Sequence, residues 1–172
     1  AGFILGISLA FIWLGSVEWP SLLHANHLGT LSAGLLALGF VVAALAKSAQ
    51  VPFSPWIARA LEGPTPSSAV FYGSLMVHAG VYLVLRLAPA FEHAPALLGL
   101  LGLFGLLTAV YGWLAGLAQT DVKSSLIFST TGQVGLMFLA CGLGWFTLAA
   151  WHLAAHAAFR AWQSVEGAHR IL

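Results

Sequence analysis

Residues 28–59 read LGTLSAGLLALGFVVAALAKSAQVPFSPWIAR, and this stretch decides the fold. It carries no charge from Leu28 to Ala46, and a helix of about 20 apolar residues is what the hydrocarbon core of a membrane requires. Lys47 follows the uncharged run, and Pro52 and Pro55 come soon after. Because proline removes a helix hydrogen bond and clashes with the preceding turn, we expect a membrane helix that is broken after Lys47.

The composition of the whole chain indicates a membrane protein. Hydrophobic residues make up 60% of the 172 residues and charged residues only 6%, with a mean hydropathy of +0.93. An ordinary soluble domain carries about 25% charged residues, so these few charges cannot solvate a surface of this size. The net charge of +1 provides no basic field, which excludes nucleic acid as a partner.

Charge-free runs predict six membrane spans in a single transmembrane domain over residues 1–172. Pro64 and Pro66 form a rigid turn before the third span, since proline fixes its own φ and restricts its predecessor. Asp121 is placed to cap the helix that follows the fourth. We expect an all-α polytopic helix bundle with spans at residues 1–17, 28–46, 67–86, 96–118 and, separated by a turn at 141–144, two within 124–159.

Other features limit the class further. The chain starts at Ala1 without Met or a basic leader, so no signal peptide is expected and the sequence reads as a piece of a longer protein. A lone Cys141 excludes an intrachain disulfide framework. No redox cofactor is expected, because the sequence has neither a cysteine cluster nor a glycine-rich dinucleotide loop.

Ionisable residues within membrane spans are candidates for function because burying them is costly. Lys47, at the helix break, can lose its water contacts and exchange a proton, or it can reach the membrane interface as an anchor. Lys123 has the same two interpretations. His78 is either a proton carrier or a ring hydrogen-bonded to a neighbouring helix.

His152 and His156 are four residues apart, so both rings project from one helix face. A neutral imidazole accepts a proton on one nitrogen and donates from the other, so the pair can form a short relay. A buried structural pair and a metal site are the alternatives, although the glutamate of a zinc-peptidase helix is missing. Arg160 stays charged and can act only as a fixed charge or an anchor.

Several motifs occur in one order along the chain. They are Lys47 to Gln50 with Pro52 and Trp56, Glu62 to Pro66 with Ser68 and Ala69, Gln119 to Lys123, Ser129 and Thr130, Gln133 to Gly135, and His152 to Phe159. Together they resemble the proton-conducting antiporter-like family over about Leu28 to Trp162. That family includes the large membrane subunits of respiratory complex I, Mrp-type cation/proton antiporters and membrane-bound hydrogenases.

The resemblance implies a half-channel bundle around the broken helix. Lys47 would be the central proton carrier, Lys123 the linking lysine, and His152 and His156 parts of a hydrophilic axis. The expected function is proton translocation in a complex I-like, NADH:quinone oxidoreductase-type assembly of the respiratory chain. The expected setting is a multi-pass position in a bacterial inner membrane, with other membrane subunits, the lipid bilayer, and protons or monovalent cations as partners.

This sequence departs from the family pattern at two positions. Tyr72 stands where a histidine is usual; it can still donate and accept a hydrogen bond on the proton path, although a phenol releases its proton less readily than an imidazole. His78 comes six residues later, about 600° around a helix, and is expected to face elsewhere. Arg160 stands where lysine is common and replaces a possible shuttle with a permanent charge.

The family also pairs its central lysine with a glutamate on an earlier helix and ends its path at a charged residue on a later one. This chain has neither helix, so it reads as the core segment of a larger subunit. We expect the chain itself to be a non-redox part of a translocase, which leaves open whether to class it as an enzyme.

Three other interpretations stay open at this point. The first is a cation/proton antiporter or the membrane subunit of an inorganic-carbon uptake complex. The second is a membrane metalloenzyme that uses His152 and His156. The third is a structural remnant, for which Lys47→Ala would leave transport unchanged.

Overall fold

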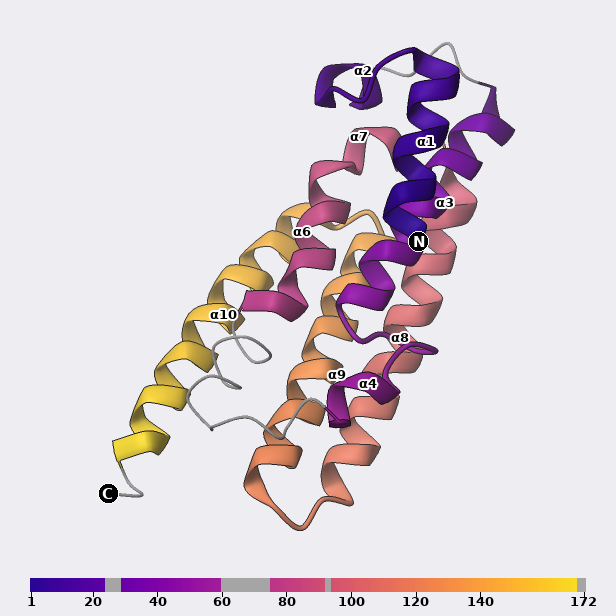
Figure 1. The fold of residues 1–172 in the computed structure, drawn as a ribbon. Helices are drawn as coiled ribbons and strands as arrows, with labels where there is room; N and C mark the ends of the chain where they lie inside the picture. Colours follow the sequence, from indigo (N-terminus) through magenta and orange to yellow (C-terminus); the bar gives the residue numbers. More distant parts are fainter. Residues whose placement is uncertain (24–28, 60–74, 92–93, 170–172) are drawn as a thin grey trace.

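The computed structural model describes residues 1–23, 29–59, 75–91 and 94–169, and every regular element in these ranges is helical (Figure 1). The all-α prediction is confirmed. In chain order the elements are α1 (Gly2–Leu14), α2 (Trp19–Leu23), α3 (Thr30–Lys47), α4 (Pro55–Arg59), the 3₁₀ helix η3 (Met76–His78), α6 (Ala79–Arg86), α7 (Ala88–Phe91), α8 (Pro95–Leu117), α9 (Val122–Gly142) and α10 (Phe146–His169).

A helix lies at each of the six predicted span positions. Among the described residues, α8 and α9 are long and apolar enough to cross a membrane, and Gly2–Leu14, Leu31–Lys47 and Met76–Arg86 are shorter apolar helices. The turn between α9 and α10 falls where it was predicted, at Gly144, whose φ of 77° suits a residue without Cβ. The start of the third span, with Pro64 and Pro66, lies outside the described residues.

The segments predicted as loops contain more helix than expected. Two short helices, α2 and α7, occupy them, and α10 continues past residue 163 to His169. Pro20, Pro89 and Pro95 each lie in the first turn of a helix. A proline lacks only an N–H that would have no partner there, so these three prolines fit the beginnings of helices.

Glycines bring α8 and α9 into backbone contact. A Cβ added to Gly112 would lie 2.6 Å from the backbone nitrogen of Gly132, and one added to Gly135 would lie 2.7 Å from that of Ala109. One added to Gly105 would lie 2.6 Å from the carbonyl oxygen of Gly135. Such small-residue contacts are typical of helix pairs in membranes, where close packing replaces the hydrophobic effect.

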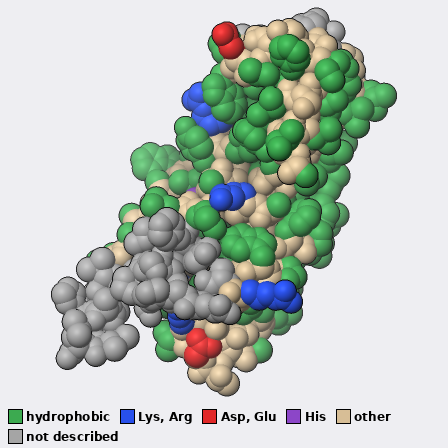
Figure 2. Space-filling view, in the orientation of Figure 1, with side chains coloured by type: hydrophobic (Ala, Val, Ile, Leu, Met, Phe, Trp, Pro, Cys, Tyr) green, Lys and Arg blue, Asp and Glu red, His purple; other side chains and the backbone are tan. Residues whose placement is uncertain are grey.

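The outer surface is strongly apolar. Figure 2 shows hydrophobic side chains over much of one face of the molecule, with few charges among them. Large side chains such as Leu31, Trp113 and Trp151 are 77%, 65% and 72% exposed. Surfaces of this kind face lipid or other apolar helices, which agrees with the membrane class.

Asp121 caps α9 as predicted. Its Oδ1 accepts a hydrogen bond of 2.8 Å from the backbone nitrogen of Ser124. This bond favours the carboxylate and lowers the pKa of Asp121 below its ordinary value. The cap fixes where α9 begins, and therefore which of its residues face α10.

The glycine contacts can be tested by adding one methyl group. We expect Gly112→Ala to lower the free energy of unfolding by about 1–3 kcal/mol, because the methyl group forces two backbones apart. Gly99→Ala is the matched control on the same helix, since nothing lies within 4 Å of a Cβ added there. Denaturant unfolding of the full-length subunit in micelles would measure both, and equal effects would contradict backbone contact at Gly112.

Candidate functional site

The helix break after Lys47 is built from residues 48–54. Helix α3 ends at Lys47, and α4 begins at Pro55. The backbone nitrogen of Val51 donates to Thr108 Oγ1 of α8 over 3.0 Å, and Trp56 Nε1 donates to the Ala46 carbonyl over 3.0 Å. The predicted break is confirmed, and side chains from α4 and α8 satisfy backbone groups that a continuous helix would have paired.

Lys47 lies at the edge of a cavity of about 380 Å³ between α3 and α6. Its side chain is exposed on the surface that the described residues form, and its role as a proton carrier stays a prediction. Arg86, Tyr82 and Trp19 line the same cavity, and none of the described residues around it is acidic. The cavity opens at the surface, and its described lining comes from α1, α2, α3 and α6.

Two buried oxygen atoms follow Lys47. Neither Ser48 Oγ nor Gln50 Oε1 has a hydrogen-bond partner among the described residues. Ser48 Oγ packs on α6, where a Cβ added to Gly80 would overlap both this oxygen and the Ala44 carbonyl. The end of α3 therefore lies against α6 two residues beyond His78.

His152 and His156 lie on one face of α10, as their spacing predicted. Their ring centroids are 6.2 Å apart with the ring planes nearly perpendicular. His152 Nε2 lies 2.9 Å from Oε1 of Gln133 on α9, within hydrogen-bond distance. His156 is deeper, with 8% of its surface exposed.

His78 is the residue that the structure adds to this pair. Its Nε2 lies 3.0 Å from Nδ1 of His156, and the ring centroids are 5.3 Å apart. Only 4% of the His78 surface is exposed. From the sequence His78 was either a proton carrier or a ring hydrogen-bonded to a neighbouring helix, and the packing of η3 and α6 on α10 makes His156 its direct partner.

Arg160 closes the cluster and is 7% exposed. Its Nε donates to His156 Nε2 over 3.4 Å, one terminal nitrogen donates to Gln163 Oε1 over 2.8 Å, and the other donates to Ser129 Oγ over 2.8 Å. The guanidinium is thus held inside the protein by groups from α9 and α10. We call His78, His152, His156 and Arg160, with Gln133, Ser129 and Gln163, the histidine cluster.

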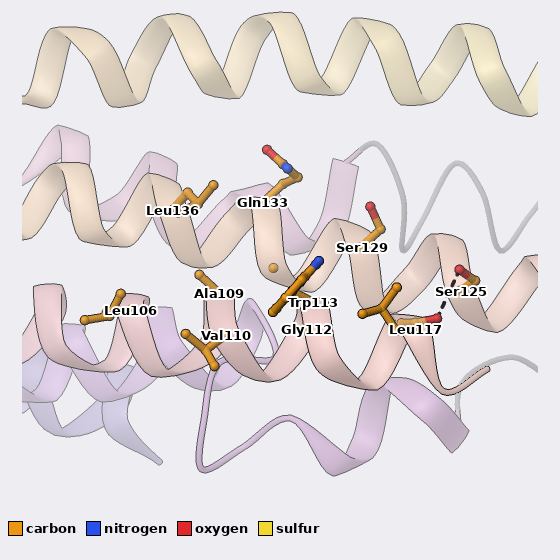
Figure 3. Close-up of a pocket in the computed structure, with 12 residues that line it drawn as sticks. Leu106, Ala109, Val110, Gly112, Trp113, Leu117, Ser125, Ser129, Gln133 and Leu136 are labelled. Atoms are coloured by element: carbon orange, nitrogen blue, oxygen red, sulfur yellow. Dashed lines mark hydrogen bonds between the residues drawn. The ribbon is translucent and has the colours of Figure 1, made fainter.

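Ser129 and Gln133 were missed as members of this cluster by sequence reasoning. In Figure 3 both side chains point from α9 toward α10, above a groove of about 480 Å³ between α8 and α9 that Trp113 also lines. Ser129 and Gln133 are four residues apart, as are His152, His156 and Arg160 on α10. Two facing stripes with this spacing are a signal that the sequence did contain.

The remaining predicted residues lie apart from the cluster or outside the description. Lys123 is half-buried in the first turn of α9. Lys47 belongs to the separate cavity at the end of α3. Tyr72 is not among the described residues. Within the part of the chain that the structure describes, no three His, Cys, Asp or Glu side chains are grouped to hold a metal ion.

The fold and the site define a class of protein: a membrane helix bundle with a broken helix and a partly buried row of polar side chains. The family model described as NADH:quinone oxidoreductase/Mrp antiporter, transmembrane, matches residues 1–163. The chain belongs to this family, which confirms the resemblance read from the motifs and the integral membrane class.

Relatives and solved structures agree with this assignment. The chain is 43% identical over 164 residues to the chloroplastic NAD(P)H-quinone oxidoreductase subunit 5 of Liriodendron tulipifera, covering 91% of this chain and 22% of that protein. A chain in the structure of the Mrp complex from Dietzia sp. DQ12-45-1b matches with a TM-score of 0.82 and 30% identity, covering 94% of this chain and 18% of that one.

An archaeal respiratory membrane complex, the membrane-bound sulfane sulfur reductase, contains a chain with the same fold. The TM-score is 0.79 at 24% identity, over 95% of this chain and 35% of that one. This chain spans about a fifth of the length of the curated relatives that it matches.

The hydrogen bond from Val51 to Thr108 is open to a direct test. We expect Thr108→Val to accelerate amide exchange across residues 48–54 and to destabilise the protein by about 1–3 kcal/mol, because the Val51 N–H loses its partner. Thr108→Ser keeps the hydroxyl and is the control. Hydrogen–deuterium exchange of the full-length subunit would measure this, and equal exchange in both variants would show that the bond does not hold the break in place.

Proposed function

We propose that this chain is the core of a proton-translocating, antiporter-like subunit of a complex I-like membrane assembly. The observation that carries the proposal is the row of imidazoles across α10 and η3, in which His156 and His78 are buried and His152 is half-buried. Family membership supports it, because the matching model groups quinone oxidoreductase and antiporter subunits. Ionisable groups buried among apolar membrane helices are retained where ions or protons pass.

The distances in the row set how a proton would move. Between His156 Nδ1 and His78 Nε2, 3.0 Å is short enough for direct exchange. The ring centroids of His152 and His156 are 6.2 Å apart, and a bridging water would complete that step. Gln133 holds the outer nitrogen of His152 and orients its ring. The row therefore conducts by alternate donation and acceptance.

Lys47 enters the proposed path through the break in α3. Ser48 Oγ and Gln50 Oε1 are buried acceptors next to it, and Ser48 packs on Gly80, close to His78. These oxygens would bind the waters that connect Lys47 with the histidine cluster. Lys123, and Tyr72 from the undescribed segment, remain predicted members of the same path.

The partners and the membrane are part of the proposal. Because the chain spans about a fifth of its relatives, the rest of the subunit and its partner subunits would cover the cavity at Lys47 and supply its counter-charge. The bacterial inner membrane stays a prediction, since the curated relative named above is chloroplastic. The absence of a redox cofactor also stays a prediction.

The first test concerns Lys47. Proton flux would be measured in proteoliposomes that contain the full-length subunit in its complex, with and without Lys47→Ala. We expect the flux to be lost with the assembly intact, because alanine cannot carry a proton. Arg59→Ala, which removes a cation from the next short helix, is the control and should keep the flux. Unchanged flux in Lys47→Ala would exclude Lys47 as a proton carrier. The interpretation of this chain as a structural remnant would then remain.

The second test concerns His156, which links the other two histidines. We expect His156→Phe to reduce the proton flux by an order of magnitude or more, because the relay loses its middle ring. Thr147→Val, an exposed position at the start of α10, serves as the control. Sodium flux, measured in the same vesicles, distinguishes a proton-translocating subunit from a cation/proton antiporter. A sodium flux that requires His156 would favour the antiporter, which the match to the Mrp complex suggests.

A further inference from the structure

Arg160 is the one member of the histidine cluster that can only donate hydrogen bonds. A guanidinium has five N–H groups and no acceptor, and it does not lose its proton in proteins. It donates to His156 Nε2, Gln163 Oε1 and Ser129 Oγ. The last two contacts are the short ones, and they hold the head of the side chain in place beside His156.

This arrangement selects the tautomer of His156. A ring nitrogen that accepts a hydrogen bond carries a lone pair and no hydrogen, so the proton of neutral His156 resides on Nδ1. A doubly protonated ring would direct a second N–H, and a second positive charge, at Arg160 Nε over 3.4 Å. Arg160 therefore also favours the neutral ring.

The tautomer of His156 in turn determines the tautomer of His78. His156 Nδ1 lies 3.0 Å from His78 Nε2, and since Nδ1 now carries the proton, Nε2 of His78 must accept it. The proton of His78 then resides on its own Nδ1. Arg160, which can only donate, thus determines which nitrogen carries the hydrogen on two imidazoles from different helices.

We propose that Arg160 is a positioning residue that fixes the Nδ1–H tautomers of His156 and His78 and closes Nε2 of His156 to an incoming proton. The second half of the proposal rests on the proton path proposed above, whereas the first half stands on the contacts alone. The permanent charge at position 160 then has a role that a proton-exchanging side chain cannot fill.

Arg160 controls proton passage through His156, and we call this control the gate. It follows from the bonds that form and break when a proton crosses the His156 ring. For a proton to pass through His156, an N–H bond forms at Nε2 while the Nδ1–H bond breaks and its proton moves to His78 Nε2. The first event requires Arg160 Nε to leave His156 Nε2. Because the bonds to Ser129 and Gln163 use the terminal nitrogens and not Nε, Nε can leave His156 while these two bonds are kept.

The tautomers can be observed by nitrogen-15 solid-state NMR. The sample is the full-length subunit with labelled histidine, within its complex in lipid bilayers, and His156→Gln and His78→Gln identify the two signals. In the wild type we expect both rings to be neutral with hydrogen on Nδ1. In Arg160→Met, which keeps the bulk of the side chain but has no donor, we expect a second population of His156 with hydrogen on Nε2.

Arg59→Met removes a cation elsewhere and is the matched control, with histidine signals as in the wild type. A wild-type His156 that carries its hydrogen on Nε2 would overturn the proposal, even if the Arg160→Met subunit failed to assemble. Unchanged tautomers in an assembled Arg160→Met complex would overturn it as well.

The gate has its own measurement. Passive proton flux through the complex should rise several-fold in Arg160→Met, and flux at the wild-type level would overturn the gate. Failure of the proposed function would instead appear as wild-type flux in Lys47→Ala and His156→Phe, with the tautomers of His156 and His78 as inferred.

Discussion

The structure depends on the requirement that backbone polar groups find partners inside the protein when no water is available. The break after Lys47 interrupts α3 and releases such groups within an otherwise apolar bundle. Thr108 of α8 and Trp56 of α4 take up two of them, the N–H of Val51 and the carbonyl of Ala46. These bonds fix the short helix α4 and the long helix α8 around the end of α3. The break is thus the place where hydrogen bonds hold α3, α4 and α8 together.

Burial of Arg160 imposes a second requirement of the same kind. A buried cation is costly unless its donors are satisfied, and hydrogen bonds to charged groups contribute about 1.5–3 kcal/mol each. Ser129 and Gln163 meet this requirement from two sides, which brings the N-terminal half of α9 against the C-terminal half of α10. His156 is a third partner of the guanidinium, so the charge of Arg160 acts on a ring that could otherwise exchange protons at either nitrogen.

The cavity at Lys47 and the histidine cluster are connected through α6. Gly80 lets the end of α3 approach so closely that a Cβ would overlap Ser48 Oγ and the Ala44 carbonyl, and His78 lies two residues before this glycine. On its other side α6 packs on α9 and α10. Among the described residues, His78 at the end of η3, directly before α6, thus lies between the broken helix and the imidazoles of α10. The open cavity beside Lys47 fits a chain that spans about a fifth of its relatives' length.

Sequence alone determined what depends on neighbours along the chain. The helical spans follow from charge-free runs, the break from Pro52 and Pro55, the start of α9 from Asp121, and the shared face of His152 and His156 from their spacing. The sequence also contained the pair Ser129 and Gln133 at helical spacing, although the helix that they face was not evident. Only tertiary structure decided that His78 meets His156 and that Arg160 meets Ser129. Those contacts join residues 78 and 31 positions apart, and they depend on how closely glycine lets the helices approach. No local pattern encodes that distance, because packing of whole helices sets it.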